Sequence, residues 1–419
     1  MKLALKYWCL WVFVGLTIKI FSDQKFLFSS QPYWKIPINY GAWPAKIHQE
    51  ASGLAAAKDG QVLMFRGNPA REGWVEGNVG SEYSEQWRFP YFNNQIHSAA
   101  KSSPIVDDDG IYVGSDTGWF YCFDFDGKVK WRLYNALSLK GVHGTAIVDG
   151  DLLFFGDYAG YLHAVNKKTG ETLWSRWLGE TLGASPLVMG DYIYANVELV
   201  PANGYITKLN KYTGTMVFKS ASMGEQSHSS PSFDKMHRHI VFGANNNIFF
   251  STDVELGTFG WSYLAKGQIK DTPVVYKGIA YYTDWAPQFY GTDLSNGHLK
   301  FAKELKTRSQ SSPALAKTGI VVADRSQLYL FSFNGDLLRE VSLGNKTHIG
   351  SPLVVHDGEK ETILTVCNET DLCRLDNQLS NRRVLFKGTK PLSAVPFVYK
   401  DLIILAQNEG DLVVLKRRK

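Results

Sequence analysis

The fold is decided by a stretch of four short runs: Ser103-Pro-Ile-Val106, Gly110-Ile-Tyr-Val-Gly114, Trp119-Phe-Tyr-Cys-Phe123 and Gly127-Lys-Val-Lys-Trp131. Residue character alternates within these runs with a period of two, and turn residues lie between them. A strand exposes successive side chains to opposite faces, so this pattern is typical of β-strands joined by tight turns. The stretch therefore predicts four antiparallel strands in sequence.

The same unit recurs down the chain. A second copy consists of Thr145-Ala-Ile-Val148 followed by the runs Asp151–Gly156, Tyr161–Val165 and Thr169–Trp174. The position of the proline, here termed the anchor, recurs every 39 to 45 residues, at Pro104, Ala146, Pro186, Pro231, Pro273, Pro313, Pro352 and Pro396. Eight copies of a four-stranded unit predict an all-β fold, an eight-bladed β-propeller.

The last copy lacks its fourth strand, because the chain stops soon after the run Leu412–Leu415. Upstream of the first copy, Glu85-Gln-Trp87-Arg-Phe89 resembles the outer strand that holds Trp131, and Trp87 lies 44 residues before Trp131, in register with the repeat. We predict that the strand around Trp87 completes the last blade, which leaves few exposed strand edges. The propeller domain would span residues 81–419.

Composition and charge exclude several classes of protein. The chain is 44% hydrophobic and 14% aromatic with 20% charged residues, which indicates a globular rather than a disordered protein. The net charge is +5, and the tail Lys416–Lys419 supplies four of these charges. The rest is close to neutral, so no basic face for nucleic acid is indicated.

The N-terminus has the pattern of an export signal. Lys2 and Lys6 precede the apolar run Tyr7–Ile18. Residues 1–22 are expected to be a cleaved signal peptide or a retained signal-anchor. Either one places the body of the chain outside the cytoplasm, in the periplasm or facing it from the inner membrane, with membrane contact through this segment only. Residues 23–80 are expected to be a linker and lead-in segment, of which residues 23 to about 60 drape over the domain.

The repeat resembles the pyrroloquinoline-quinone-type propeller repeat. The likeness rests on Ser185–Val188, Ser351–Val354 and Ala164–Trp174, and Met64–Arg71 is similar to a lead-in found before such propellers. The resemblance covers residues 81–419 and implies the propeller fold. It leaves activity open, because the repeat occurs in quinoprotein dehydrogenases and in non-catalytic propellers, such as the propeller subunit of the outer-membrane β-barrel assembly machinery.

The motifs of a catalyst are missing from the sequence. The resemblance implies an adjacent Cys-Cys pair and a Ca²⁺ site in dehydrogenases, but no two cysteines are adjacent here. Asp107-Asp-Asp109-Gly110 is typical of a tight hairpin turn. The short repeat leaves little chain for a lid. We therefore predict no catalytic residue, metal or cofactor. The alternatives are a pyrroloquinoline-quinone-dependent dehydrogenase with Ca²⁺ and a propeller that binds a carbohydrate or small ligand.

Residues just before each inner strand are expected to surround one mouth of the central channel. The candidates for binding a ligand or partner there are Lys101, His143, His228, Lys270, Gln310 and His348. Two lysines and three histidines could bind an anionic ligand or an acidic peptide, or they could form the hydrated polar lining of any propeller. Trp285 breaks the repeat in Thr283–Pro287, so it is either a contact for a protein partner or a packed core residue.

Cys367 and Cys373 bracket a predicted hairpin turn. Their spacing allows a cross-hairpin disulfide in an oxidising compartment, and two free buried thiols are the alternative. The sequence as a whole predicts an exported, non-catalytic propeller that acts as a scaffold for a protein partner in the cell envelope.

Overall fold

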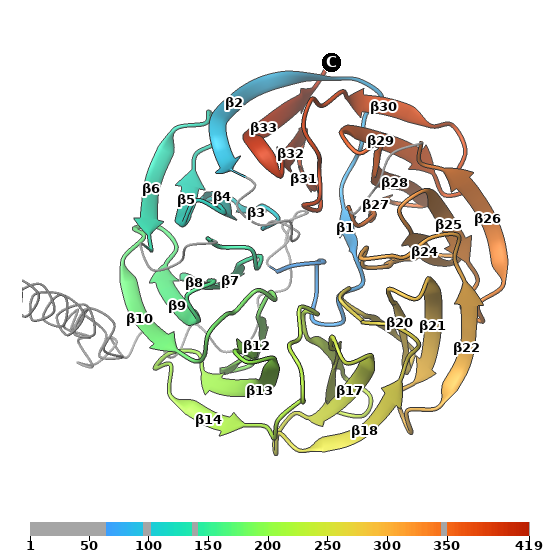
Figure 1. Ribbon diagram of the computed structural model, residues 1–419. Helices are drawn as coiled ribbons and strands as arrows, with labels where there is room; N and C mark the ends of the chain where they lie inside the picture. The colour runs from blue at the N-terminus through green and yellow to red at the C-terminus, as the bar shows by residue number, and fades with distance from the viewer. Residues whose placement is uncertain (1–63, 95–101, 136–140, 345–349, 419) are drawn as a thin grey trace, which may run out of the picture. The chain divides into compact units, whose positions relative to one another are not determined.

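The computed structural model in Figure 1 describes residues 64–94, 102–135, 141–344 and 350–418. In these residues eight sheets surround a common centre, as the blades of a propeller. Each blade is antiparallel and four-stranded, with one added parallel strand in blade 7. The predicted fold is confirmed. Within the described ranges, no helix is long and apolar enough to cross a membrane.

Blades 1 to 4 follow chain order from the inner to the outer strand: β3 (Ile105–Asp107), β4 (Gly110–Gly114), β5 (Trp119–Phe123), β6 (Val129–Tyr134); β7 (Ile147–Asp149), β8 (Leu152–Gly156), β9 (Tyr161–Asn166), β10 (Thr172–Trp177); β11 (Leu187–Met189), β12 (Tyr192–Leu199), β13 (Asn203–Asn210), β14 (Met216–Lys219); β15 (Ser232–Asp234), β16 (His239–Gly243), β17 (Ile248–Asp253), β18 (Phe259–Leu264).

Blades 5 to 7 repeat the order: β19 (Val274–Tyr276), β20 (Ile279–Thr283), β21 (Gln288–Asp293), β22 (Leu299–Glu304); β23 (Ala314–Ala316), β24 (Gly319–Ala323), β25 (Gln327–Phe331), β26 (Leu337–Ser342); β27 (Leu353–Asp357), β28 (Lys360–Cys367), β29 (Asp371–Asp376), β30 (Arg383–Phe386). Blade 8 has β31 (Phe397–Tyr399), β32 (Leu402–Ala406), β33 (Glu409–Arg417) and, from the other end of the chain, β2 (Tyr83–Asn94).

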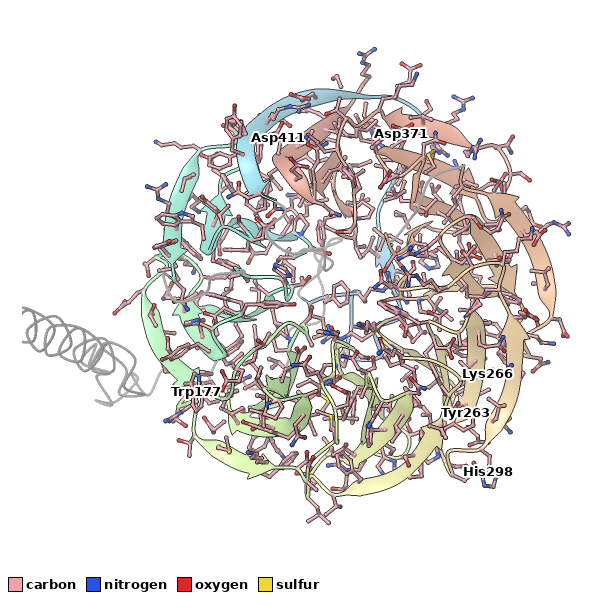
Figure 2. All side chains as sticks on the ribbon, viewed as in Figure 1. Trp177, Tyr263, Lys266, His298, Asp371 and Asp411 are labelled. Atoms are coloured by element: carbon pink, nitrogen blue, oxygen red, sulfur yellow. A yellow bond between two sulfur atoms is a disulfide. The ribbon has the colours of Figure 1, made fainter. Side chains whose placement is uncertain are left out.

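The two ends of the domain close the ring as predicted. Strand β2 pairs antiparallel with β33, and Trp87 lies opposite Val414. Arg88 on β2 forms an ion pair of 2.6 Å with Asp411, which Figure 2 labels at blade 8. The indole nitrogen of Trp87 donates to the carbonyl of Phe125 in blade 1 at 2.9 Å. The strand thus joins the C-terminal blade to the first one.

The described part of the lead-in, from residue 64 on, reaches the inside of the ring, whereas the part expected to drape over the domain, residues 23 to about 60, lies outside the described residues. Strand β1 (Trp74–Glu76) lies near the centre of the ring in Figure 1 and pairs parallel with β27, so that Trp74 lies opposite Val354. It is the fifth strand of blade 7. Three residues are too few to show the alternation of polar and apolar side chains that marks a strand. The strand forms because an open edge of blade 7 is there to pair with it.

Aromatic side chains of the outer strands pack between neighbouring blades. The ring of Trp131 covers Gly170 of blade 2, where a Cβ atom would come within 2.7 Å of the indole, and Trp131 Nε1 donates to the Lys167 carbonyl at 2.8 Å. Only glycine leaves room for such close approach at a positive φ. The same relation holds for Trp87 on Gly127, Trp174 on Gly214, Phe218 on Gly257, Trp261 on Gly297 and Phe301 on Gly335.

The Ser-Pro motif forms a hydrogen-bonded chain around the ring. The residue before each anchor donates its backbone N–H to the hydroxyl of the equivalent residue in the next blade: Ser103 to Thr145, Thr145 to Ser185, Ser185 to Ser230, Ser230 to Thr272, Thr272 to Ser312, and Ser312 to Ser351. Blade 8 has Val395 at this position, which carries no hydroxyl. Its backbone N–H donates to the Ser103 hydroxyl at 2.9 Å, which joins the last blade to the first.

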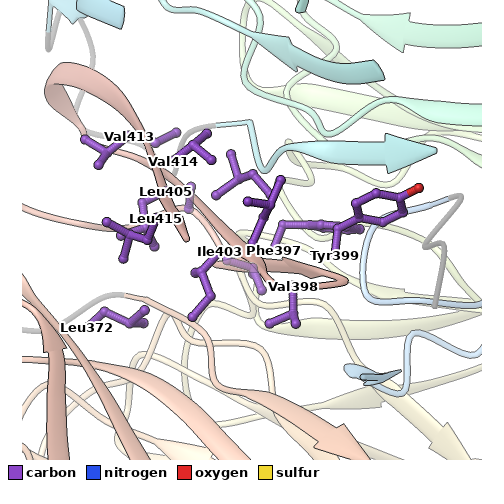
Figure 3. Packing of buried hydrophobic residues seen from close by; sticks show 14 of the residues in the cluster. Leu372, Phe397, Val398, Tyr399, Ile403, Leu405, Val413, Val414 and Leu415 are labelled. Carbon is purple, nitrogen blue, oxygen red and sulfur yellow. The ribbon is translucent and has the colours of Figure 1, made fainter. Parts of the chain in front are cut away.

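Ion pairs and apolar packing complete the interfaces between blades. Lys211 Nζ of blade 3 lies 2.6 Å from Asp149 of blade 2, and both side chains are buried. Asp107 accepts hydrogen bonds from the backbone of Asp109 and Gly110, which confirms the predicted tight turn. Figure 3 shows part of the largest apolar cluster, in which side chains of blade 8 pack near Leu372 of blade 7.

Candidate functional site

One end of the propeller, here termed the mouth face, is formed by the loops that lead to the inner strands and by the turns between second and third strands. His143, His228, Lys270 and Gln310 precede inner strands, as expected. The remaining two candidates, Lys101 and His348, lie outside the described residues.

The centre of the ring is occupied by the chain itself. We term residues 64–77 the central segment. Its backbone carbonyls accept hydrogen bonds of 2.7 to 3.0 Å from inner strands or their first residues in four consecutive blades: Pro69 from Phe233, Ala70 from Val275, Glu72 from Leu315, and Gly73 from Val354. Each donor lies two residues after an anchor. Inner edges that a propeller would leave open to the channel are therefore paired in blades 4 to 7.

Two buried arginines hold the central segment through the carbonyls of the anchors. Arg71 donates to Pro186 at 2.6 Å and to Pro231 at 3.1 Å. Arg66 donates to Pro352 at 2.7 Å and also to Pro313. Burial lowers the pKa of each guanidinium to about 9. A planar fork of several donors suits this task, because one side chain can satisfy carbonyls from two blades.

A buried carboxyl lies close enough to Arg66 to interact with its charge. Burial raises the pKa of Asp271 to about 8, and the hydrogen bonds from Thr283 and the positive charge of Arg66 oppose that rise. Asp271 Oδ2 accepts from the backbone N–H of Thr283 at 2.8 Å and from its hydroxyl at 3.1 Å. Asp271 directly follows Lys270, so this buried group lies directly behind the mouth face.

One side of the mouth face, on blades 3 and 4, contains the buried carboxylate of Glu198. This residue lies near the end of β12, is almost fully buried, and approaches His228 Nδ1 at 2.9 Å. The hairpin of β12 and β13 that carries Glu198 is long and regular, and it pairs Leu199 with Asn203. His143 is buried against Tyr158, with ring centroids 4.4 Å apart.

The other side of the mouth face, on blades 5 and 6, is basic. Trp285 is half-buried in the turn between β20 and β21. Lys270 Nζ lies 4.1 Å from the centroid of its ring, and Arg308 Cζ lies 4.8 Å from the same centroid. Arg325 lies near enough that the charge of Arg308, after burial, lowers the Arg325 pKa. We term Lys270, Trp285, Arg308 and Arg325 the cation–tryptophan cluster. The structure thus brings together Lys270 and Trp285, two residues predicted separately.

Nearby carboxylates are engaged by their own turns. Asp284 accepts hydrogen bonds from the backbone of Gly267, Ala286 and Gln288 and from the Tyr290 hydroxyl, at 2.8 to 3.0 Å. Asp324 accepts from the backbone of Thr307 and from the Tyr329 hydroxyl. These contacts order the turns that carry Trp285 and Arg325.

The remaining candidates lie away from the mouth face or are structural. Cys367 and Cys373 form a disulfide across the hairpin of β28 and β29, with Cα atoms 6.0 Å apart. Burial raises the pKa of the Cys122 thiol to about 12, so this cysteine is unreactive at neutral pH. In the described ranges, no three His, Cys, Asp or Glu residues are grouped so that they could hold a metal ion.

Sequence comparisons give one family and several relatives. The family model described as outer membrane protein assembly factor BamB matches residues 126–247. BamB of Yersinia pestis is 26% identical over 162 residues, 34% of this chain and 40% of the relative. BamB of Shewanella oneidensis is 24% identical over 216 residues, 47% and 52% of the two chains. BamB of Moranella endobia is 24% identical over 284 residues, which are 62% of this chain and 58% of the relative. The chain matches about half the length of these curated relatives.

Solved structures share the architecture. BamB from Moraxella catarrhalis superposes with a TM-score of 0.61 at 17% identity, over 80% of this chain and 100% of that one. A europium-containing methanol dehydrogenase superposes with a TM-score of 0.70 at 13% identity, over 86% of this chain and 99% of that one. Quinohemoprotein alcohol dehydrogenase from Comamonas testosteroni superposes with a TM-score of 0.69 at 11% identity, over 87% of this chain and 82% of that one. At these identities they show the fold alone. The chain is an eight-bladed propeller that is similar to BamB in sequence and in fold.

Proposed function

We propose that the protein is an exported, non-catalytic scaffold that binds a protein partner in the cell envelope. The observation that carries the proposal is the sequence match to relatives named as outer membrane protein assembly factors. A periplasmic location, free or tethered to the inner membrane through the N-terminal segment, follows from the same likeness and from the basic start and apolar run of that segment.

The filled centre also favours a scaffold over a quinone enzyme. Any ligand that lay along the inner edges of blades 4 to 7 would have to displace the backbone hydrogen bonds of the central segment. It would also leave Arg66 and Arg71 buried without their carbonyl partners, which is costly for a charged group. We therefore propose that the protein uses neither pyrroloquinoline quinone nor Ca²⁺. Calorimetric titration of the full chain with both tests this, and saturable binding would overturn it.

Recognition would take place at the mouth face. Trp285 offers a rigid aromatic surface that is partly open to solvent, and aromatic and arginine side chains dominate the energy of protein interfaces. The described loops are held by buried turn carboxylates and by the hydroxyl chain, so the surface is preorganised. A rigid surface loses little conformational entropy when a partner binds.

The test is crosslinking in living cells followed by purification of the tagged full chain. We expect wild type to recover an envelope protein and Trp285→Ala to lose most of it. Trp177→Ala is the matched control, because Trp177 is an exposed tryptophan on β10 of blade 2, labelled in Figure 2. Recovery by all three proteins would exclude Trp285 as the contact. Recovery of no envelope protein by wild type would overturn the scaffold function.

A further inference from the structure

Two cations of the cation–tryptophan cluster lie over one aromatic side chain, and a third lies near one of them. Lys270 and Arg308 both lie within 5 Å of the Trp285 ring centroid. Burial lowers the pKa of Lys270; the charges of Glu198 and Glu225 oppose that fall, and the charge of Arg308 adds to it. Burial and then the charge of Arg308 lower the pKa of Arg325. Arg308 therefore repels both neighbouring cations, and the aromatic face of Trp285 offsets part of that repulsion.

No carboxylate neutralises this cluster within ion-pairing distance. In the part of the chain that the structure describes, neither Lys270, Arg308 nor Arg325 forms a salt bridge with an acidic residue. By contrast, neighbouring Lys306 is paired with Glu340 at 2.9 Å. Two buried acids of the adjoining turns, Asp284 and Asp324, are held by backbone N–H groups and tyrosine hydroxyls. The cluster thus keeps a net positive charge at the surface, which the charges of Glu198 and Glu225 reduce at Lys270.

The arrangement of the cluster favours a chain-like ligand over a small enclosed anion. Its residues come from four loops on blades 5 and 6, Arg308 is exposed, and the others are half-buried. Charges spread over an open surface suit a ligand that presents several carboxylates along its length. The half-buried Trp285 between them provides apolar contact for the stems of such side chains.

We infer that the cation–tryptophan cluster binds an acidic stretch of a polypeptide, through Asp or Glu carboxylates that contact Lys270, Arg308 and Arg325. The inference rests on the proposed function for the existence of a protein partner. It adds the chemistry of the partner and the part of the mouth face that the partner contacts. Glu198 and Glu225, whose charges reach Lys270, would repel the same stretch, which favours a position over Arg308 and Arg325 on blades 5 and 6.

The test uses the purified full chain and a fluorescein-labelled peptide of eight glutamates, with binding followed by fluorescence anisotropy at low salt. We expect saturable binding that weakens as salt is added, because exposed charges are screened. The same peptide with eight glutamines should not bind. Inorganic phosphate at equal charge should compete poorly, because it cannot span the loops. Equal binding of the glutamine peptide, or displacement by phosphate at low concentration, would overturn the inference.

Variants locate the site. Arg308→Gln should weaken glutamate-peptide binding about threefold, and Lys270→Gln with Arg308→Gln about tenfold, as expected for surface charge contacts. Arg308→Lys, which keeps the charge, should restore most of the affinity. Lys235→Gln is the control, because Lys235 is exposed in the turn after β15, at the opposite end of blade 4. If Lys235→Gln weakens binding as much as Arg308→Gln, the peptide binds by net charge and the inference fails.

The two proposals fail in distinguishable ways. If the envelope partner is recovered equally by wild type and by the Lys270→Gln/Arg308→Gln variant, the acidic-segment inference is wrong and the scaffold function stands. If the glutamate peptide binds the cluster but cells yield no envelope protein, the proposed scaffold function fails instead.

Discussion

The hydroxyl chain around the ring makes a sharp prediction at Ser230. Its hydroxyl accepts the backbone N–H of Ser185 at 3.0 Å, and both residues are buried. Ser230→Ala removes the acceptor and leaves a buried N–H without its partner. The expected cost is about 1–3 kcal/mol of unfolding free energy. With an unfolding entropy of about 2.1 cal/mol/K per residue, a domain of roughly 340 residues would then melt about 1.5–4 °C lower.

The assay is thermal unfolding followed by circular dichroism, together with urea unfolding at 25 °C. Ser230→Thr should be close to neutral, because Thr145 and Thr272 already fill the same position in blades 2 and 5. Ser262→Ala is the matched control, since Ser262 is exposed on β18. The reasoning is refuted if Ser230→Ala costs no more than Ser262→Ala, or if Ser230→Thr is as damaging as Ser230→Ala.

Three further outcomes are expected. Trp87→Ala should cost about 3 kcal/mol in urea unfolding, because it removes the indole that covers Gly127 and joins blade 8 to blade 1; the exposed Trp177→Ala should cost less than about 0.5 kcal/mol, and equal costs would contradict this role. Lys211→Met should cost about 3–5 kcal/mol by leaving Asp149 buried and unpaired, whereas adding Asp149→Leu should recover most of it; a double variant as unstable as the single one would argue against the ion pair. Burial raises the pKa of Asp271 in the folded state to about 8 from an ordinary value of 3.8, so folding favours the protonated carboxyl. This contribution to stability is present below about pH 4 and is lost as the pH rises through 8. Asp271→Asn should therefore be more stable than wild type at pH 8 and should flatten the plot of unfolding free energy against pH; parallel plots for the two proteins would contradict the assignment.

The repeating parts of the fold could be predicted because their sequence pattern occurs several times in the chain. The Ser-Pro motif and the turn glycines recur at constant spacing, and each recurrence has the same physical cause, a hydrogen bond or an aromatic side chain from the next blade. The strand around Trp87 could be placed because it keeps the register of the repeat. A pattern that occurs many times can be separated from chance without a structure.

The parts that occur once could not be predicted. Arg66 and Arg71 lie in a segment without periodicity, and their partners are backbone carbonyls of distant blades, which leave no trace in residue type. Glu198 lies in the long hairpin of β12 and β13, where nothing in the sequence pattern marks it as a buried residue. Trp285 could be singled out because it interrupts the repeat, but its contact with Arg308 depends on how two neighbouring blades approach each other.

The closure of the ring has a consequence for the order in which the protein folds. The Arg88–Asp411 pair joins residues 323 positions apart, and Arg66 reaches Pro352 across 286 positions. Strand β2 precedes all eight blades' inner strands in the chain, yet its partner β33 is the last described strand to be synthesised. Contacts of such long range form slowly. The central segment gains its partners one after another, from Pro186 in blade 3 to Val354 in blade 7. The pairing edge of β2 stays open while blades 1 to 7 assemble, and a chain that ends before β33 would keep that edge permanently open.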